Sequence, residues 1–296
     1  MRSTRRGVAL GLGAAATFGA STPFAKRLLD DVDAELLAGL LYLGAFAALL
    51  LTTAVRTSAA EARLRRSDAP RLACLVLTGG VLAPVAMLLG LDRVSGASGS
   101  LLLNLEGPFT LLVAVLAFGE HLGRRALVGA AAIFAGAAAL TSGGPDGEDT
   151  VLGLLLIGAA CVLWAIDNNV TQSLTERDPH AIVLVKTGIA AAVNIVVAVV
   201  VAGQPIPQAP VLASALLLGG VAYGLSTLLD AHALRELGAA QEAAVFATAP
   251  FIGLVLAVPV LGHRPSPAEL VAAVAMALGL AVLLRENHAH MHTHAE

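Results

Sequence analysis

The sequence predicts an all-α membrane protein of ten transmembrane helices, arranged as two inverted repeats of five helices each. Three observations predict this fold: the composition, a series of long apolar stretches, and an internal repeat. Of the 296 residues, 57% are hydrophobic and 13% are charged, and the mean hydropathy is +0.82. Soluble domains carry roughly 25% charged residues. Because a soluble protein could not keep so much apolar surface from water, lipid is the expected solvent.

The apolar stretches are long enough to cross a bilayer, for which a helix needs about 20 mostly apolar residues. They are separated by short breaks that carry charged or turn-forming residues, and an acidic Gly/Pro linker at 142–150 falls near the midpoint. The ten helices are predicted at residues 7–27, 35–55, 71–91, 96–118, 124–141, 151–171, 180–202, 210–232, 239–261 and 267–284.

The distribution of Lys and Arg predicts the orientation, because cytoplasmic loops of membrane proteins carry an excess of these residues. With the N-terminus inside the cell, most of the 18 Lys and Arg fall in cytoplasmic loops. The exceptions are Lys26, Arg27, Arg93 and Arg264 in external loops, and Lys186 within a helix. We therefore expect a multi-pass protein of the cell inner (plasma) membrane with both termini in the cytoplasm.

The internal repeat is visible in residues other than Leu, Ala and Val. One constant shift places Arg93 on Arg235, Gly96 on Gly238 and Pro108 on Pro250. The predicted units are a first repeat at 7–141, the linker at 142–150, a second repeat at 151–285 and a His-rich cytoplasmic tail at 286–296. Since five is odd, the second repeat enters the membrane in the opposite sense. This plan is common in secondary transporters and places the solute site between the halves, near the bilayer midplane.

Paired residues in each half extend the pattern. Phe18-Gly19 and Trp164-Ala165 occupy the first helix of each half, and the fourth helix opens with Gly96-Ala97 and carries Pro108. With the Gly119-Glu120 step, this arrangement resembles the EamA type of the drug/metabolite transporter superfamily. The second half departs from the pattern, because it reads Gly262-His263 without a Glu. The resemblance implies a secondary carrier, most often an exporter, of a small amino-acid-like, nucleoside-like or drug-like solute.

Glu106 is the most deeply placed carboxylate, close to the middle of the fourth predicted helix. A charge in the hydrocarbon core costs roughly 2.5–3.5 kcal/mol on insertion scales, so its presence needs a reason. We expect Glu106 to bind a proton or a cationic group, with Asn104 a half-turn away. The alternative is a protonated Glu that bonds a carbonyl group freed by Pro108. Thr248 is the corresponding residue of the second half.

A second polar layer lies on the sixth and seventh predicted helices. Asp167 and Lys186 have similar depth on helices that are consecutive in the chain, so we expect a structural ion pair, with a solute or coupling role as the alternative. Asn168, Asn169 and Asn194 are expected to line the solute path or to form interhelical hydrogen bonds. The prolines within predicted helices, where kinks are expected, are Pro23, Pro84, Pro108 and Pro250.

The C-terminal tail alternates histidines, which suit a divalent metal such as Zn²⁺: His288, His290, His292 and His294. A rival interpretation is therefore a divalent metal-ion transporter with a collecting tail; another is a non-transporting membrane scaffold. The sequence carries no triad, phosphate-binding Gly loop or paired catalytic carboxylates, so neither an enzyme nor a cofactor is expected. Without long basic runs no nucleic-acid partner is expected, and the oligomeric state stays open.

Overall fold

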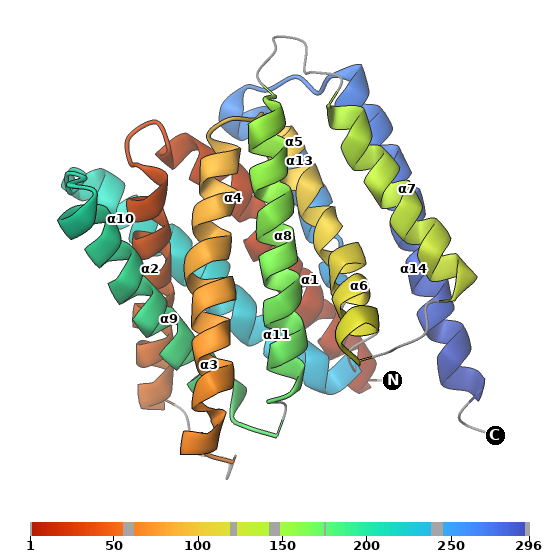
Figure 1. Cartoon of the computed structure of the whole chain (residues 1–296), viewed down its shortest axis with the longest axis horizontal. Helices are drawn as coiled ribbons and strands as arrows, with labels where there is room; N and C mark the ends of the chain where they lie inside the picture. Colours follow the sequence, from red (N-terminus) through yellow and green to blue (C-terminus); the bar gives the residue numbers. More distant parts are fainter. Residues whose placement is uncertain are drawn as a thin grey trace.

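The computed structural model describes residues 2–55, 62–118, 123–141, 149–174, 176–237 and 245–293. Within these ranges the regular elements are helices, apart from one isolated bridge between Ala62 and Arg177 (Figure 1). The all-helical prediction is therefore confirmed for the described part of the chain.

In the first half, two of the apolar stretches form helices interrupted by another helical geometry. The third stretch passes from α-helix through a π-helical segment, and the fourth contains a 3₁₀ turn. The elements are α1 (Arg2–Leu28), α2 (Ala34–Val55), η1 (Arg66–Asp68), α3 (Ala69–Leu75), η2 (Val76–Leu82), α4 (Ala83–Leu91), α5 (Gly96–Leu102), η3 (Leu103–Leu105), α6 (Glu106–Phe118) and α7 (Arg124–Leu140).

The second half shows the same kind of interruption, with π-helical segments in two of its helices. Its elements are α8 (Val151–Gln172), α9 (Pro179–Val196), η4 (Val197–Val201), α10 (Ala209–Gly219), η5 (Gly220–Leu225), α11 (Ser226–Leu237), α13 (Ala249–Leu261) and α14 (Pro267–Thr293). The π-helical segments η2 and η5 lie in the third predicted helix of each half.

Six described segments are long and apolar enough to cross a membrane. They are Arg5–Leu28, Ala34–Thr53, Arg66–Leu91, Val151–Thr171, Pro179–Val201 and Ala209–Asp230. Two shorter apolar helices, Ala249–Leu261 and Pro267–Leu283, accompany them.

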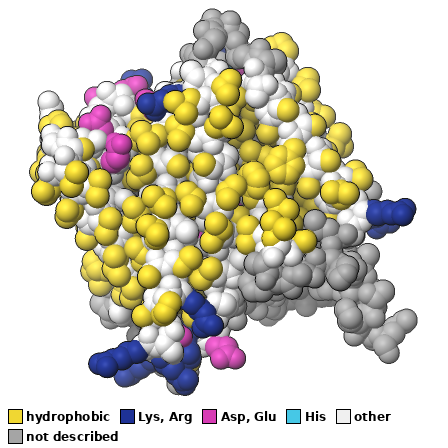
Figure 2. Space-filling view, in the orientation of Figure 1, with side chains coloured by type: hydrophobic (Ala, Val, Ile, Leu, Met, Phe, Trp, Pro, Cys, Tyr) yellow, Lys and Arg dark blue, Asp and Glu magenta, His cyan; other side chains and the backbone are white. Residues whose placement is uncertain are grey.

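The outer surface is strongly apolar. Figure 2 shows hydrophobic side chains over most of the visible face, with Lys and Arg gathered at the end where α3 begins. Leu51, Leu116 and Val201 expose 73%, 77% and 77% of their surface. Because water would penalise such a surface, it suits contact with lipid chains.

Helices of the two halves interleave rather than forming separate bundles. From the second half, α8 packs against α4 and α6, α9 packs against α2 and η2, and α13 packs against α1 and α5. Glycines allow the closest approaches: a Cβ added at Gly44 would collide with the Leu216 carbonyl group, and one at Gly219 with that of Leu41. Backbones of the two halves therefore come into direct contact at these glycines.

Candidate functional site

The fourth predicted helix of each half is broken, and the two breaks lie at positions that correspond in the internal repeat. The 3₁₀ turn η3 ends at Leu105, so Glu106 begins α6, and Pro108 lies in the first turn of that helix. In the second half, Thr248 precedes α13, and Pro250 lies in the first turn. Pro has no backbone N–H, and the first helical turn is where its absence costs least. Glu106 and Thr248, each two residues before a proline, therefore lie at a discontinuity in the helix.

Glu106 is bonded across the two halves. The Nδ2 atom of Asn168, on α8, donates to Oε1 of Glu106 at 2.6 Å. The Glu106 side chain is half-buried, and no Lys, Arg or His of the described residues lies within ion-pair distance of it. The neighbouring Gly107 is exposed, and a Cβ added there would meet no atom within 4 Å. An acid in this setting is stable when it holds a proton or a cation.

Asp167 and Lys186 form an ion pair within the second half. Nζ of Lys186, on α9, lies 2.5 Å from Oδ2 of Asp167, on α8, and the side chains are 17% and 7% exposed. The other carboxylate oxygen of Asp167 is buried and has no hydrogen-bond partner in the described part of the protein. Because both residues belong to the same half, this pair does not bridge the halves.

The pair rests on a glycine surface of the first half. A Cβ added at Gly79, in η2, would collide with the Asp167 carboxyl group. One added at Gly80 would lie 2.8 Å from Cβ of Ala190, on α9. The absence of side chains in η2 therefore lets α8 and α9 bring the ion pair against the backbone of the first half.

The π-helical turn and Pro84 leave two carbonyl groups of η2 without their usual α-helical partners. The N–H of Ala83 donates to Thr78 instead of Gly79, and Tyr42 Oη donates to the Gly79 carbonyl at 2.6 Å. Pro84 cannot donate to the Gly80 carbonyl four residues earlier. Nδ2 of Asn194 donates to that carbonyl at 3.1 Å. Side chains of α2 and α9 thus satisfy backbone groups that would otherwise be unpaired in an apolar medium.

An aromatic cluster continues from Tyr42. Its ring lies 5.5 Å from that of Tyr223, which lies 5.8 Å from Phe18, and Phe18 lies 5.5 Å from Phe246. Trp164 is buried on α8, one turn before Asp167. The polar residues therefore adjoin aromatic rings, which favour apolar or cationic groups of a solute.

Comparison with known proteins gives the family. The model of the EamA-like transporter family matches residues 5–142 and again residues 151–285. The chain belongs to the EamA-like transporter family. The resemblance inferred from the sequence is confirmed, and with it membership of the drug/metabolite transporter superfamily.

Two individual proteins are similar to this EamA-family chain. An uncharacterized transporter of Methanothermobacter thermautotrophicus (strain ATCC 29096 / DSM 1053 / JCM 10044 / NBRC 100330 / Delta H) is 28% identical over 233 residues, which are 77% of this chain and 68% of that protein. A protein known from a crystal structure shares the fold, with a TM-score of 0.65 and 19% identity over 93% of this chain and 95% of that one. The chain is thus a multi-pass membrane protein of a transporter family, whose partners are the bilayer and a small-molecule solute.

Not every predicted residue of this EamA-family protein joins the Glu106 or Asp167 clusters. Asn104 donates to the Leu101 carbonyl group at 3.0 Å and contacts Sδ of Met276, on α14, at 3.8 Å. Asn169 donates to the backbone carbonyl groups of Ala165 and Thr110 at 2.8 and 3.2 Å. The Thr248 hydroxyl group donates to the Val245 carbonyl at 2.7 Å. Pro23 lies inside the continuous helix α1, and Pro84 lies at the start of α4, directly after η2.

The predicted metal ligands of the tail lie outside what the structure describes. This applies to the side chains of His288, His290 and His292 and to the whole of His294. Within the described residues, no group of three or more His, Cys, Asp and Glu could hold a metal ion.

Tyr42, Gly79 and Gly80 were not among the residues predicted from the sequence. A signal for the glycines was present, because Gly79-Gly80-Val81 recurs as Gly219-Gly220-Val221 in the third predicted helix of the second half. A second signal was the proline four residues after Gly80, which predicts a carbonyl group in need of a donor.

Proposed function

We propose that this EamA-family protein is a secondary transporter that exports a small metabolite across the inner (plasma) membrane by alternating access. The observation that carries the proposal is the bond between Glu106 and Asn168. It places an acid at a helix break where the two halves meet, and no Lys, Arg or His of the described residues lies within ion-pair distance of that acid. Inverted-repeat carriers bind their solutes in this position.

The proposed architecture is ten transmembrane helices in two inverted repeats, 7–141 and 151–285, joined by 142–150. Two separate family matches, at 5–142 and 151–285, support the two repeats. The related breaks before Pro108 and Pro250 support them as well. The arginines at the start of α1 and those that precede α3 support cytoplasmic termini.

The contacts suggest which interactions change during transport. Asn168, Asn169 and Asn194 lie in the second half and donate to groups of the first half: the Glu106 carboxylate and the carbonyl groups of Thr110 and Gly80. These bonds must rearrange when the halves move relative to each other. The ion pair of Asp167 and Lys186 lies within one half and can move with it. Glu106 is therefore the proposed exchange site for a proton or a cationic solute group, and the ion pair a structural support.

A ligand screen followed by flux measurement tests the proposal. The purified protein is first screened by thermal shift against amino acids, nucleosides, sugars, polyamines and divalent metals. Each stabilising compound is then tested, radiolabelled, in proteoliposomes with an imposed pH gradient. The proposal expects saturable flux above that of protein-free liposomes. Stabilising compounds that are never transported would favour the scaffold interpretation, and transport restricted to divalent metals would favour the metal-ion transporter.

A further inference from the structure

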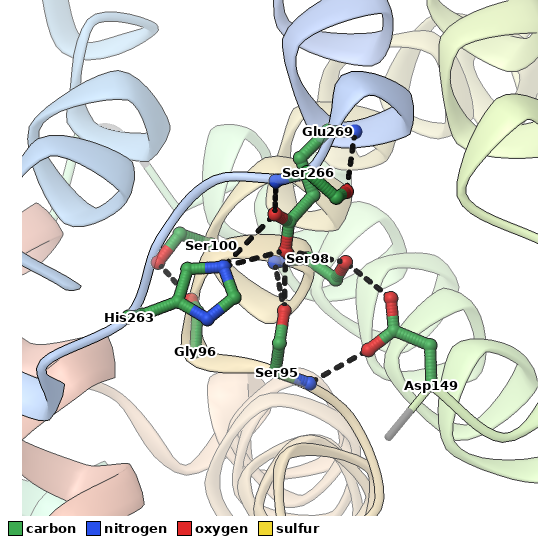
Figure 3. A network of polar contacts seen from close by, with 8 residues as sticks. All are labelled: Ser95, Gly96, Ser98, Ser100, Asp149, His263, Ser266 and Glu269. Atoms are coloured by element: carbon green, nitrogen blue, oxygen red, sulfur yellow. Dashed lines mark hydrogen bonds and ion pairs between the residues drawn. The ribbon is translucent and has the colours of Figure 1, made fainter. Parts of the chain in front are cut away.

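A buried polar network joins the two halves at the predicted external end of the molecule (Figure 3). Its members come from the start of α5, from the end of the linker at 142–150, and from the turn and first helical residues that connect α13 to α14. They are Ser95, Ser98, Asp149, His263, Ser266 and Glu269. None of these residues has a role in the solute site described above.

Glu269 is the centre of the network and is 1% exposed. Its carboxylate accepts from Ser95 Oγ at 2.6 Å and from the backbone N–H of Ser266 at 2.7 Å. Nε2 of His263 lies 2.9 Å from Oε2. The N–H of Glu269 in turn donates to Ser266 Oγ at 3.1 Å, which completes a capping box at the start of α14. The capping box uses only one carboxylate oxygen of Glu269. It therefore does not explain why the other carboxylate oxygen accepts a bond from Ser95.

The first turn of α5 also holds Asp149. The N–H of Ser95 donates to Oδ1 of Asp149 at 2.7 Å, and Ser98 Oγ donates to Oδ2. Ser95 Oγ caps the helix by accepting from the N–H of Ser98 at 2.9 Å. Two serines one helical turn apart in the first half therefore contact two carboxylates: Asp149 at the end of the linker and Glu269 in the second half.

The two serines are shielded from water by the surrounding packing. Ser95 and Ser98 are 3% and 0% exposed, and a Cβ added at Gly96 would collide with the side chain of Leu261, at the end of α13. His263 and Glu269 both belong to the second half, so their contact does not prevent the halves from separating. The bonds that must break for α5 to leave α14 are those that Ser95 Oγ and Ser98 Oγ donate to Oε1 of Glu269, at 2.6 and 3.3 Å.

We propose that Ser95, Ser98 and Glu269 form the external gate of the carrier and keep it closed in the state seen here. The gate rests on the proposed function, because alternating access requires this end to open. When the gate opens, Glu269 loses its bonds to the hydroxyl groups of α5 but keeps its contacts with His263 and Ser266. Its carboxylate therefore still has hydrogen-bond partners. The strength of the serine contacts then sets how often the solute path is open to the outside.

Labelling of a cysteine from outside tests the gate without any solute. The reporter is Thr248→Cys, half-buried at the helix break of the second half, in a background with Cys74→Ala and Cys161→Ala. A charged, membrane-impermeant methanethiosulfonate reagent is added to intact cells. We expect Ser95→Ala to raise the labelling rate at least about tenfold, which corresponds to about 1.4 kcal/mol of shift toward the open state. Ser95→Thr, which keeps the hydroxyl group and caps helices well, should label at the parent rate.

Ser98→Ala gives a second test that leaves the helix cap hydroxyl in place, and it should also speed labelling. Asp92→Asn is the matched control: its side chain is 52% exposed and pairs with Arg93 at the same end, so labelling should not change. If Ser95→Ala and Ser98→Ala both label at the parent rate, whether or not their melting temperatures fall, the gate is wrong. The labelling experiment needs no solute, so it tests the gate separately from the flux experiment. A failure to find flux would contradict the proposed function without changing the labelling result.

Discussion

Asn168 on α8 donates from Nδ2 to Oε1 of Glu106 on α6, and the two atoms are 2.6 Å apart. The two residues belong to different halves of the chain and meet beside the break in the fourth predicted helix. The preceding residue of α8 is Asp167, whose partner Lys186 comes from the same half. Glu106 therefore bridges the halves, whereas Asp167 is neutralised within the second half. The predictions below separate their roles.

The ion pair of Asp167 and Lys186 is expected to stabilise the fold. Asp167→Asn or Lys186→Met leaves the other charge buried without its partner, which should cost roughly 3–5 kcal/mol. The double variant removes both charges and should recover much of the loss. Melting temperatures of the purified proteins in detergent check this. Losses that simply add in the double variant would show that the pair is not energetically coupled.

Gly79 is expected to be required for docking of the pair. In Gly79→Ala the new methyl group would collide with the Asp167 carboxyl group, and overpacking of this kind typically costs roughly 1–3 kcal/mol. Gly158→Ala is the matched control, because a Cβ at that glycine of α8 meets no atom within 4 Å. The control should be neutral or slightly stabilising, since Ala favours helix over Gly. Equal melting temperatures for the two variants would refute the docking argument.

Hydropathy could predict the helical segments because a membrane helix must be apolar along about 20 consecutive residues. Depth along a helix could also predict that Asp167 meets Lys186, since the two residues have similar depth on consecutive antiparallel helices. Sequence could not predict that Glu106 meets Asn168, because that contact depends on how α6 packs against α8. The grouping of Asn104 with Glu106 has no support in the hydrogen bonds: two residues along a helix turn the side chain by about 200°, and Asn104 contacts Met276 instead.

The external network was missed although part of it has a sequence signature. Ser266-Pro-Ala-Glu269 is a capping box with a proline at the first helical position. This signature predicts the start of α14, yet it says nothing about the oxygen that accepts from Ser95. That contact joins residues that are far apart in the sequence, and only the packing of α5 against α13 and α14 brings them together.

Locking α5 to α13 is expected to stop transport. A Cβ built at Gly96 lies 3.9 Å from Cβ of Ala257, within the range of about 3.5–4.5 Å that disulfides need. In Gly96→Cys/Ala257→Cys, on the background without Cys74 and Cys161, oxidation should lower flux of the transported solute at least about tenfold, and reduction should restore it. Each single variant serves as the control for the oxidant. Normal flux in the cross-linked protein would show that α5 and α13 need not separate.

The histidine tail is expected to be dispensable for transport. Deletion of residues 287–296 removes His288, His290, His292 and His294 together and leaves the apolar part of α14, Pro267–Leu283, complete. Melting temperature and flux should match the full chain, whereas binding of Zn²⁺, measured by isothermal titration calorimetry, should be largely lost. Collapse of flux on deletion would instead favour the metal-ion transporter.

Glu106→Gln tests the central claim most directly, because it keeps the shape of the side chain and removes its ability to exchange a proton or hold a cation. Flux of the transported solute is measured in proteoliposomes across a range of pH, beside Thr248→Val at the related position. We expect an unchanged melting temperature and flux at least about tenfold lower, which needs only about 1.4 kcal/mol of lost differential binding. The pH dependence should flatten because the titrating group is gone, and Thr248→Val should have a much smaller effect. Normal flux of Glu106→Gln with the parent pH profile would contradict the account and move the site to Asp167, Asn168 and Asn169.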